Sequence, residues 1–503
     1  MYSQVSTAAW SLALVAQLVG ADNPGQIGSY NGLAVTPAMG WDNWNAFGCD
    51  VSEDLLLGTA QKIVDVGLRD LGYNYVILDD CYSDGRYPNG TIKPNFQKFP
   101  NGFKHVSDRL HALGLKYGMY SSAGYLTCGR YTASLGREMT DAQTFADWGV
   151  DFLKYDNCYN GGQSGTAQIS YTRYKAMSDA LNATGRPILY NMCSWGDDGP
   201  WNWAQTMANS WRMSGDVYDS FSRPDERCPC TGDEPGYLCA LPGFHCSILN
   251  IMNKMAKIVS KTQTGAQNDM DALEVGNGGM TDDEYLTHMS MWTLEASQLV
   301  MGTDIRSLDP SAYSILANPA VLALNQDPAV SAGARRWIHQ VADKDENDAG
   351  NIQLWARTMN NTDAVIALVN AGNTLRDMNA TLADIFFDQG GVISPQARQG
   401  WDIYDLWANR MDNETASSIL NGTAPAIISV DDMLNQTTRW NVSMMSYAEG
   451  LNANASALFG KMIGSVDALG TVTAKNVSRH GVALYRLRAN GKGMSKLDAR
   501  DEL

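Results

Sequence analysis

The chain has 503 residues, a formal net charge of −17 at pH 7, 44% hydrophobic residues and 18% charged residues. This composition is normal for a globular protein, and the length is sufficient for one large domain and a smaller one. Nucleic acids and anionic membranes bind to basic patches, so the excess of acidic residues argues against both as partners.

The first predicted element is a secretory signal peptide over residues 1–21. A mostly apolar, uncharged segment extends from about residue 8 to residue 19, and the small residues Val19 and Ala21 suit a signal-peptidase site. The usual positive charge before this segment is missing, and a short buried helix is the alternative interpretation. No later segment has the ~18 apolar residues that a membrane-spanning helix needs.

From residue 35 to about 305, short apolar segments alternate with helix-like stretches. Eight of the segments are predicted strands, at 33–41, 73–81, 115–122, 150–158, 187–195, 210–216, 268–275 and 298–304. Each is followed by a plausible helix, and parallel strands need such crossover connections. The pattern predicts a (β/α)8 barrel over residues 28–330, with a doubly wound sheet as the alternative.

One predicted helix illustrates the pattern. Thr140 and Gln143 have the spacing of an N-terminal capping box, and Phe145 and Trp148 supply apolar side chains three residues apart. We expect Gly149 to end this helix, because the next predicted strand begins at residue 150.

The pattern changes near residue 330. Short alternating runs follow, at 335–341, 351–359, 364–372, 401–410 and 480–489. They predict an antiparallel β domain, a sandwich, over residues 331–490. The polar segment 491–503 is expected to form a loose tail.

The sequons favour a secreted glycoprotein. Eight of the ten Asn-X-Ser/Thr sequons follow residue 350, and the ten asparagines are Asn89, Asn182, Asn360, Asn379, Asn413, Asn421, Asn435, Asn441, Asn454 and Asn476. The chain ends in Arg-Asp-Glu-Leu, which resembles an endoplasmic-reticulum retention signal. Partial retention is therefore an alternative, and secretion is the main expectation.

The cysteines fit the same compartment. All nine lie between residues 49 and 246, and an oxidising compartment would pair most of them and leave one over. A cytosolic zinc protein is a weak alternative, because the chain has only six His and no CxxC pair.

Polar side chains gather at the carboxyl ends of the predicted strands, where a barrel carries its catalytic groups. Side chains alternate along a strand, so Lys154 and Asp156 share one face, as do Arg212 and Asp216. The other strand ends carry Asp79, Asp80, Asn191, Cys193, Trp195, Asp269 and Asp271.

Two carboxylates on different strands suit glycoside hydrolysis, in which one attacks the anomeric carbon or activates water and the other protonates the leaving oxygen. We expect Lys154 to keep Asp156 ionised, which favours Asp156 as the nucleophile. The residue pattern by itself does not decide which carboxyl is the acid.

Each group also has a structural interpretation. The aspartates could cap helices, and Asp79 with Asp80 could bind a hard cation. Lys154 and Asp156 could form a structural ion pair, and Cys193 could be an inert buried thiol. Trp44 and Trp195 could belong to the core.

Six motifs occur in the order MGWDNWNAFGC (39–49), LDDCY (78–82), KYDNCY (154–159), CSWG (193–196), WRMSGD (211–216) and NDMDALEVGNGG (268–279). With the later segments DIFFDQG, WDIYDLWANR and HGVALYRLR, they resemble glycoside hydrolase family 27, in particular the fungal and yeast secreted α-galactosidases, or melibiases. The resemblance covers about residues 30 to 490 and implies a (β/α)8 barrel followed by an antiparallel β domain. It implies no cofactor or metal, which weakens the cation interpretation.

The resemblance implies a retaining exo-glycosidase that releases terminal α-D-galactose from substrates such as melibiose, raffinose-type oligosaccharides and galactomannan. By motif, Asp156 is the nucleophile and Asp216 is the acid/base. The implied substrate-binding residues are Trp44, Asp79, Asp80, Tyr120, Lys154, Cys193, Trp195, Arg212 and Asp271.

The group at the 2-position of the sugar separates two activities within the family. An N-acetyl group needs small residues such as Ser and Ala, whereas Cys193 and bulky Trp195 favour a free 2-hydroxyl. An α-N-acetylgalactosaminidase is the close alternative, and an inactive carbohydrate-binding protein on the same scaffold is an alternative of another class. The oligomeric state stays open.

The resemblance also implies the disulfides Cys49–Cys81, Cys128–Cys158, Cys228–Cys246 and Cys230–Cys239, which leave Cys193 as the free thiol. One departure from the family pattern is Gln267, because the family usually has Gly-Trp before the Asn-Asp of the seventh strand. The resemblance therefore does not determine the packing behind Asp271.

Overall fold

The computed structural model describes residues 30–223, 245–387, 393–425, 428–436 and 438–493. The expected signal peptide, the segment 494–503 of the expected tail, and Cys228, Cys230 and Cys239 lie outside these residues. Among the residues that are described, no helix has the length and apolar content needed to cross a membrane.

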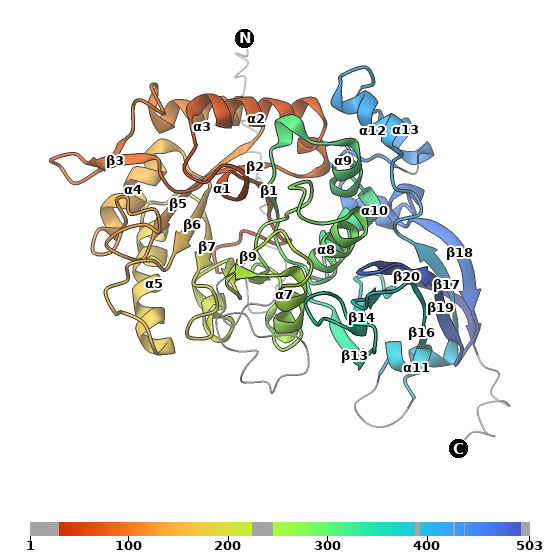
Figure 1. Ribbon diagram of the computed structural model, residues 1–503. Coiled ribbons are helices and arrows are strands. Elements are labelled where there is room, and N and C mark those ends of the chain that lie inside the picture. The colour runs from red at the N-terminus through yellow and green to blue at the C-terminus, as the bar shows by residue number, and fades with distance from the viewer. Residues whose placement is uncertain (1–29, 224–244, 388–392, 426–427, 437, 494–503) are drawn as a thin grey trace, which may run out of the picture.

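Eight parallel strands form a closed barrel in the N-terminal part of the chain (Figure 1). They are β1 (Met39–Asp42), β2 (Tyr75–Leu78), β5 (Lys116–Ser122), β6 (Phe152–Asp156), β7 (Leu189–Cys193), β8 (Ser210–Arg212), β11 (Gln267–Asp269) and β12 (Leu299–Met301). Neighbours in the sheet follow the order of the chain, and β1 also pairs with β12. A parallel bridge between Leu273 and Met301 joins the remaining edges.

This topology confirms the predicted barrel and excludes the doubly wound alternative, whose sheet would keep two open edges. All eight predicted strands are present, although most are shorter than the apolar segments that predicted them. The main barrel helices are α2 (Glu53–Asp65), α3 (Gly102–Ala112), α4 (Glu138–Trp148), α5 (Ala167–Ala183), α7 (Ile248–Met255), α8 (Asp282–Leu294), α9 (Pro310–Leu316) and α10 (Pro319–Asn325). Short elements on the loops are α1 (Trp44–Phe47), β3 (Ser83–Arg86), β4 (Ile92–Pro94), β9 (Asp216–Val217) and β10 (His245–Cys246).

The capping box predicted at Thr140 is wrong. Helix α4 begins two residues earlier, at Glu138, and its N-cap residue Arg137 makes no side-chain cap. The first turn is fixed instead by buried Asp141, which pairs with Arg86 at 2.6 Å. The predicted end of the helix is confirmed, because Gly149 follows it with φ of 81° in the left-handed region that glycine tolerates best.

The C-terminal part is a β sandwich. Its six-stranded antiparallel sheet has the order β13-β14-β15-β20-β17-β18, and the pair β16-β19 faces it. The bounds are β13 (Ala334–Gln340), β14 (Asn351–Thr358), β15 (Ala364–Asn370), β16 (Arg376–Thr381), β17 (Gln399–Asp405), β18 (Lys461–Val466), β19 (Thr471–Val477) and β20 (Val482–Gly493). Short helices connect them: α11 (Leu382–Ile385), α12 (Asn413–Leu420), α13 (Val430–Asn435) and α14 (Tyr447–Asn452).

The five predicted strands of this part are present, and β16, β18 and β19 were not predicted. Strand β20 extends to Gly493, three residues into the segment expected to form the tail. We propose residue 330 as the domain boundary, since it lies between α10 and β13.

Barrel and sandwich share one apolar core. Trp355, Val365 and Leu484 of the six-stranded sheet belong to the same buried cluster as the barrel residues. Buried Arg357 of β14 donates hydrogen bonds to the carbonyls of Thr293 and Leu324, at 3.2 and 3.1 Å. The sandwich is thus packed directly against α8 and α10 at one side of the barrel (Figure 1).

Candidate active site

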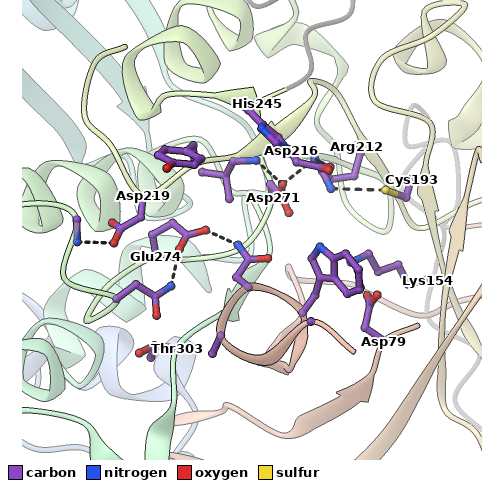
Figure 2. Close-up of a pocket in the computed structure, with 18 of the residues that line it drawn as sticks. Asp79, Lys154, Cys193, Arg212, Asp216, Asp219, His245, Asp271, Glu274 and Thr303 are labelled. Carbon is purple, nitrogen blue, oxygen red and sulfur yellow. Dashed lines mark hydrogen bonds and ion pairs between the residues drawn. The ribbon is translucent and has the colours of Figure 1, made fainter. Parts of the chain in front are cut away.

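A cavity of about 1040 Å³ opens at the carboxyl ends of the barrel strands. Asp79 and Lys154 lie on one side of the view in Figure 2, Asp219, Glu274 and Thr303 on the other, and Asp216 and Asp271 between them. Ten of the eleven predicted catalytic and substrate-binding residues line it: Trp44, Asp79, Tyr120, Lys154, Asp156, Cys193, Trp195, Arg212, Asp216 and Asp271.

Asp80 is the predicted residue that does not line the cavity. It is 1% exposed, and both of its carboxylate oxygens accept backbone N–H groups, from Cys81 at 2.7 Å and from Gly129 at 2.7 Å. Its carboxylate thus holds the loop that follows β5 against the end of β2. The adjacent Asp79, with the opposite orientation, is the one that faces the cavity.

Asp156 ends β6, lines the cavity and is 6% exposed. Its Oδ1 accepts the backbone N–H of Asn157 at 2.8 Å, and its Oδ2 accepts the Tyr120 hydroxyl at 2.9 Å. Burial and the charge of Asp216 together raise the pKa of Asp156 to about 7.

The expectation that Lys154 keeps Asp156 ionised is therefore wrong. Lys154 does lower the pKa of Asp156, but burial and Asp216 outweigh it. The ammonium of Lys154 binds the Asp79 carboxylate at 2.6 Å and lies 3.6 Å from Asp42. Burial disfavours this charge, yet Asp42 and Asp79 raise the pKa of Lys154 well above its usual value.

Asp42 does not line the cavity, but it lies 3.6 Å from the ammonium of Lys154, and the sequence analysis did not single it out. It ends β1, it is 5% exposed, and burial raises its pKa to about 7 even though Lys154 is close. A signal was available, because Asp42 lies inside the first motif at the carboxyl end of a predicted strand.

Asp216 lies nearer to solvent than Asp156. Its side chain is 41% exposed, and its Oδ1 pairs with buried Arg212 at 2.9 Å. Arg212 also pairs with Asp271 at 2.6 Å, and Asp271 accepts the backbone N–H of Val217 at 2.7 Å. Asp271 therefore holds both the arginine and the strand β9 that carries Asp216.

Cys193 and Trp195 line the cavity beside these charges. Cys193 is a free, buried thiol that accepts a hydrogen bond from Arg212 at 3.5 Å. Trp195 and Asp271 have φ of 54° and 81°, conformations that are uncommon for residues other than glycine. Such strained positions at a cavity are typical of functional sites.

The cavity extends beyond the predicted residues toward the loops after β11 and β12, which bring Glu274, Asn277, Thr303 and Asp304 to it. Glu274 is 3% exposed, and it accepts hydrogen bonds from the side-chain amides of Asn45 and Asn277. Burial raises the pKa of Glu274 to about 8. Glu274 lies inside the sixth motif, so a signal was available, but only the fold brings Asn45 to it.

Two disulfides stabilise the rim of the cavity, Cys49–Cys81 and Cys128–Cys158, as the resemblance implied. Cys246 is also disulfide-bonded, and its expected partner Cys228 lies outside the described residues, as does the pair Cys230–Cys239. Among the described residues, Cys128, Asp156 and Cys158 are spaced closely enough to hold a metal ion. These two sulfurs are bonded to each other, so they do not make a metal site.

Gln267 lies at the opposite end of the barrel. Its side-chain amide donates to the carbonyls of Ala34 and Gln263, at 2.9 and 3.3 Å. The departure from the family pattern thus affects the bottom of β11, whereas Asp271 is held at the top by Arg212 and Val217.

Comparisons with known proteins agree with this geometry. A family model described as alpha galactosidase A matches residues 36–227 and 245–327, and a model described as the alpha galactosidase C-terminal beta sandwich domain matches residues 349–429. An α-galactosidase of Lachancea cidri is 53% identical over 460 residues, which are 92% of this chain and 95% of the relative. Alpha-galactosidase 2 of Saccharomyces cerevisiae is 53% identical over 462 residues, with the same coverage.

Solved structures show the same likeness. An α-galactosidase from Saccharomyces cerevisiae superimposes with a TM-score of 0.87 at 52% identity, covering 92% of this chain and 100% of that one. A structure of α-galactosidase from the same yeast with raffinose gives a TM-score of 0.87 at 51% identity, with the same coverage. α-Galactosidase I of Mortierella vinacea gives a TM-score of 0.75 at 41% identity, again covering 92% and 100%.

Proposed function

The chain belongs to the α-galactosidases of glycoside hydrolase family 27 and hydrolyses terminal α-galactose, and we propose that Asp156 and Asp216 carry out this reaction by a retaining double displacement. Asp156 is the nucleophile and Asp216 is the acid/base. The observation that carries this assignment is the difference in environment between the two carboxyls.

The nucleophile has to be held rigidly against the anomeric carbon, and the acid/base has to exchange protons with water and with the leaving group. Asp156 is 6% exposed and fixed by Tyr120 and Asn157. The Asp216 side chain is 41% exposed, on the solvent side of the cavity. The roles thus follow from burial and contacts, and not from the charge of Lys154.

In the first step, an oxygen of Asp156 attacks the anomeric carbon while protonated Asp216 gives its proton to the departing oxygen. The product is a galactosyl ester of Asp156. In the second step, ionised Asp216 takes a proton from water, and the water attacks the same carbon and releases Asp156. The pair must hold one proton on Asp216 at the start. A proton on Asp216 removes the negative charge that, with burial, raises the pKa of Asp156, and this favours the ionised form of Asp156.

We assign the remaining cavity residues to recognition of the sugar. Asp79, Lys154, Arg212 and Asp271 supply charged donors and acceptors for its hydroxyls, and Trp44 and Tyr120 supply aromatic walls. Cys193 and Trp195 are assigned to the 2-position, where Trp195 excludes an N-acetyl group. We assign Asp80 to holding the loop at Gly129 rather than to the sugar.

The catalytic assignment is tested by trapping the ester with 5-fluoro-α-D-galactosyl fluoride, followed by peptide mass mapping. We expect one label, on Asp156, and none in Asp156→Ala. A label on Asp216, or full activity of Asp156→Ala, would overturn the assignment. Measured turnover would at the same time exclude the inactive carbohydrate-binding alternative.

Substrate choice is tested with paired p-nitrophenyl α-glycosides. We expect kcat/KM for the galactoside to exceed that for the N-acetylgalactosaminide. Faster turnover of the acetamido substrate would favour the α-N-acetylgalactosaminidase alternative. Melibiose and galactomannan, tested beside raffinose by galactose release, then rank the natural substrates.

We further propose that the protein is secreted and carries N-glycans. The side chains of nine of the ten sequon asparagines are exposed, and the exception is Asn441, which is 2% exposed and cannot carry a glycan in the folded protein. Expression in a yeast host tests this through N-terminal sequencing, which should place cleavage after Ala21, and through glycopeptide mapping. The amount of protein in the medium and in the cells, compared between the full chain and a chain without its last four residues, measures the retention.

A further inference from the structure

Arg173 is a buried charge that the proposed mechanism does not use. It lies on α5 and is 4% exposed. Its guanidinium donates three hydrogen bonds: from Nε to the Gln163 carbonyl at 2.8 Å, from Nη1 to the Ala123 carbonyl at 2.8 Å, and from Nη2 to Asn157 Oδ1 at 2.6 Å. A buried arginine with every acceptor in a loop is well suited to hold those loops in place.

Two of the three acceptors belong to residues that contact the end of β6. Ala123 directly follows β5, and its N–H donates to the carbonyl of Asp156 at 2.8 Å. Asn157 directly follows Asp156, and its N–H donates to Asp156 Oδ1 at 2.8 Å. The Asn157 side chain is 2% exposed and donates in turn to Asp197 at 2.9 Å. Arg173 is therefore one residue removed from the carboxylate of Asp156.

We propose that Arg173 is a positioning residue for catalysis, whose guanidinium fixes Asn157 and through it the orientation of the Asp156 carboxylate. The inference rests on the proposed role of Asp156 as nucleophile. A carboxylate that attacks carbon must present one oxygen along a narrow path, and a displacement of about 1 Å can cost about 100-fold in rate. Arg173 itself touches neither the cavity nor the carboxylate.

Lysine is the informative replacement at residue 173. It keeps the positive charge, but its single nitrogen on a flexible stem cannot reproduce a planar fork that spans three acceptors. Arg173→Lys therefore tests geometry separately from charge.

Arg186, whose side chain is 31% exposed, provides a control at the other end of β6. Its Nε donates to the Val150 carbonyl at 2.6 Å, and its Nη2 donates to the Gly149 carbonyl at 3.0 Å and pairs with Asp151 at 2.5 Å. Arg186 thus fastens the segment entering β6, whereas Arg173 fastens the segment leaving it. A general loss of stability would affect both variants, and a loss of positioning would affect only Arg173→Lys.

The pH profile gives a second readout. The titratable groups that face Asp156 are Tyr120, Lys154, Tyr174, Cys193 and Asp216, from β5, β6, α5, β7 and β9. Arg173→Lys leaves four of them without a changed contact, and it keeps a positive charge near Tyr174, over whose ring the Arg173 guanidinium lies at 4.7 Å. Displacement of the Asn157 N–H removes a contact that favours the ionised carboxylate, so the acid limb of kcat/KM should move to higher pH.

The experiment compares kcat, KM, pH profile and thermal stability of wild type, Arg173→Lys and Arg186→Lys on p-nitrophenyl α-galactoside. For Arg173→Lys we expect kcat to fall by about 10- to 100-fold, KM to stay within about twofold, and the acid limb to move upward. Arg186→Lys should keep kcat and the acid limb of the wild type. Equal losses of kcat in both variants, or a change of Arg173→Lys in thermal stability alone, would overturn the inference.

Asn157→Ala keeps the test decisive if Arg173→Lys does not fold. This variant retains the backbone N–H but removes the side chain that Arg173 holds, so kcat and the acid limb should change in the same direction. Where both variants fold, the double variant Arg173→Lys/Asn157→Ala should lose little more kcat than either single variant, because both substitutions break the same chain of contacts to Asp156. If the losses of kcat instead multiply fully, the positioning role of Arg173 through Asn157 is contradicted. Ester trapping separates the two proposals, since a label on Asp156 with unchanged kcat in Arg173→Lys rejects only the positioning role.

Discussion

Replacing Asp156 with asparagine should stabilise the protein, and more so as the pH rises. The pKa of Asp156 is raised from 3.8 to about 7 in the folded state, mainly by burial. A carboxyl with a raised folded pKa supports folding fully below its unfolded pKa, and this support is lost as the pH rises through the folded pKa. The contribution of the Asp156 carboxyl to the free energy of unfolding of the wild type is therefore lost between about pH 4 and pH 7.

The magnitude follows from the shift. About three pKa units at about 1.4 kcal/mol each give at most about 4 kcal/mol above pH 7, and nothing below about pH 4. With an unfolding entropy of about 2 cal/mol/K per residue, this corresponds to about 4 °C in Tm for a chain of this length. The amide that replaces the carboxyl in Asp156→Asn cannot ionise. The Tm of the variant minus that of the wild type should therefore grow by up to about 4 °C between about pH 4 and pH 7.

The assay is thermal unfolding of Asp156→Asn and wild type from pH 4 to pH 8. Asp42 also has a pKa raised to about 7, but it is present in both proteins and largely cancels in the difference. Asp54→Asn removes an exposed carboxylate on α2 and serves as the control. A Tm difference that is constant with pH, or that shrinks as the pH rises, would refute the reasoning.

Three further predictions follow from the same cavity. Asp216→Asn should lower kcat about 100- to 10,000-fold on an aryl galactoside, because it removes the acid/base. It should also move the acid limb of kcat/KM to lower pH, because Asp216 raises the pKa of Asp156, and an upward shift would contradict this. Trp195→Ala should raise the kcat/KM ratio of the N-acetylgalactosaminide to the galactoside at least about tenfold, and an unchanged ratio would place the 2-position elsewhere. Replacing the two cysteines of either disulfide with serines should lower the free energy of unfolding by about 3.5 kcal/mol, because the sequence separations are similar, at 30 and 32 residues. Loss of Cys128–Cys158 should lower kcat more than loss of Cys49–Cys81, because the Cys128 sulfur lies 3.3 Å from Asp156. Equal kcat in the two serine pairs would contradict this last expectation.

Much of the fold could be predicted because the signals are local. Apolar segments bounded by polar residues marked all eight barrel strands, and short apolar or alternating runs between turn residues marked five strands of the sandwich. Strand β18 escaped because five of its six residues are exposed, which leaves no alternation to detect. The start of α4 escaped because the ion pair between Asp141 and Arg86 joins residues far apart in the sequence.

The site divides in the same way. The sequence alone placed Lys154 and Asp156 on one face of a strand and Arg212 and Asp216 on another, and barrel topology brings all strand ends to one rim. Only the tertiary structure decided that Asp79 faces the cavity while Asp80 turns to the backbone of Gly129. It likewise decided that Lys154 pairs with Asp79, and that the pKa of Asp156 rises. The physical reason is that strand alternation is a property of neighbouring residues, whereas desolvation and charge depend on every strand that surrounds a carboxyl.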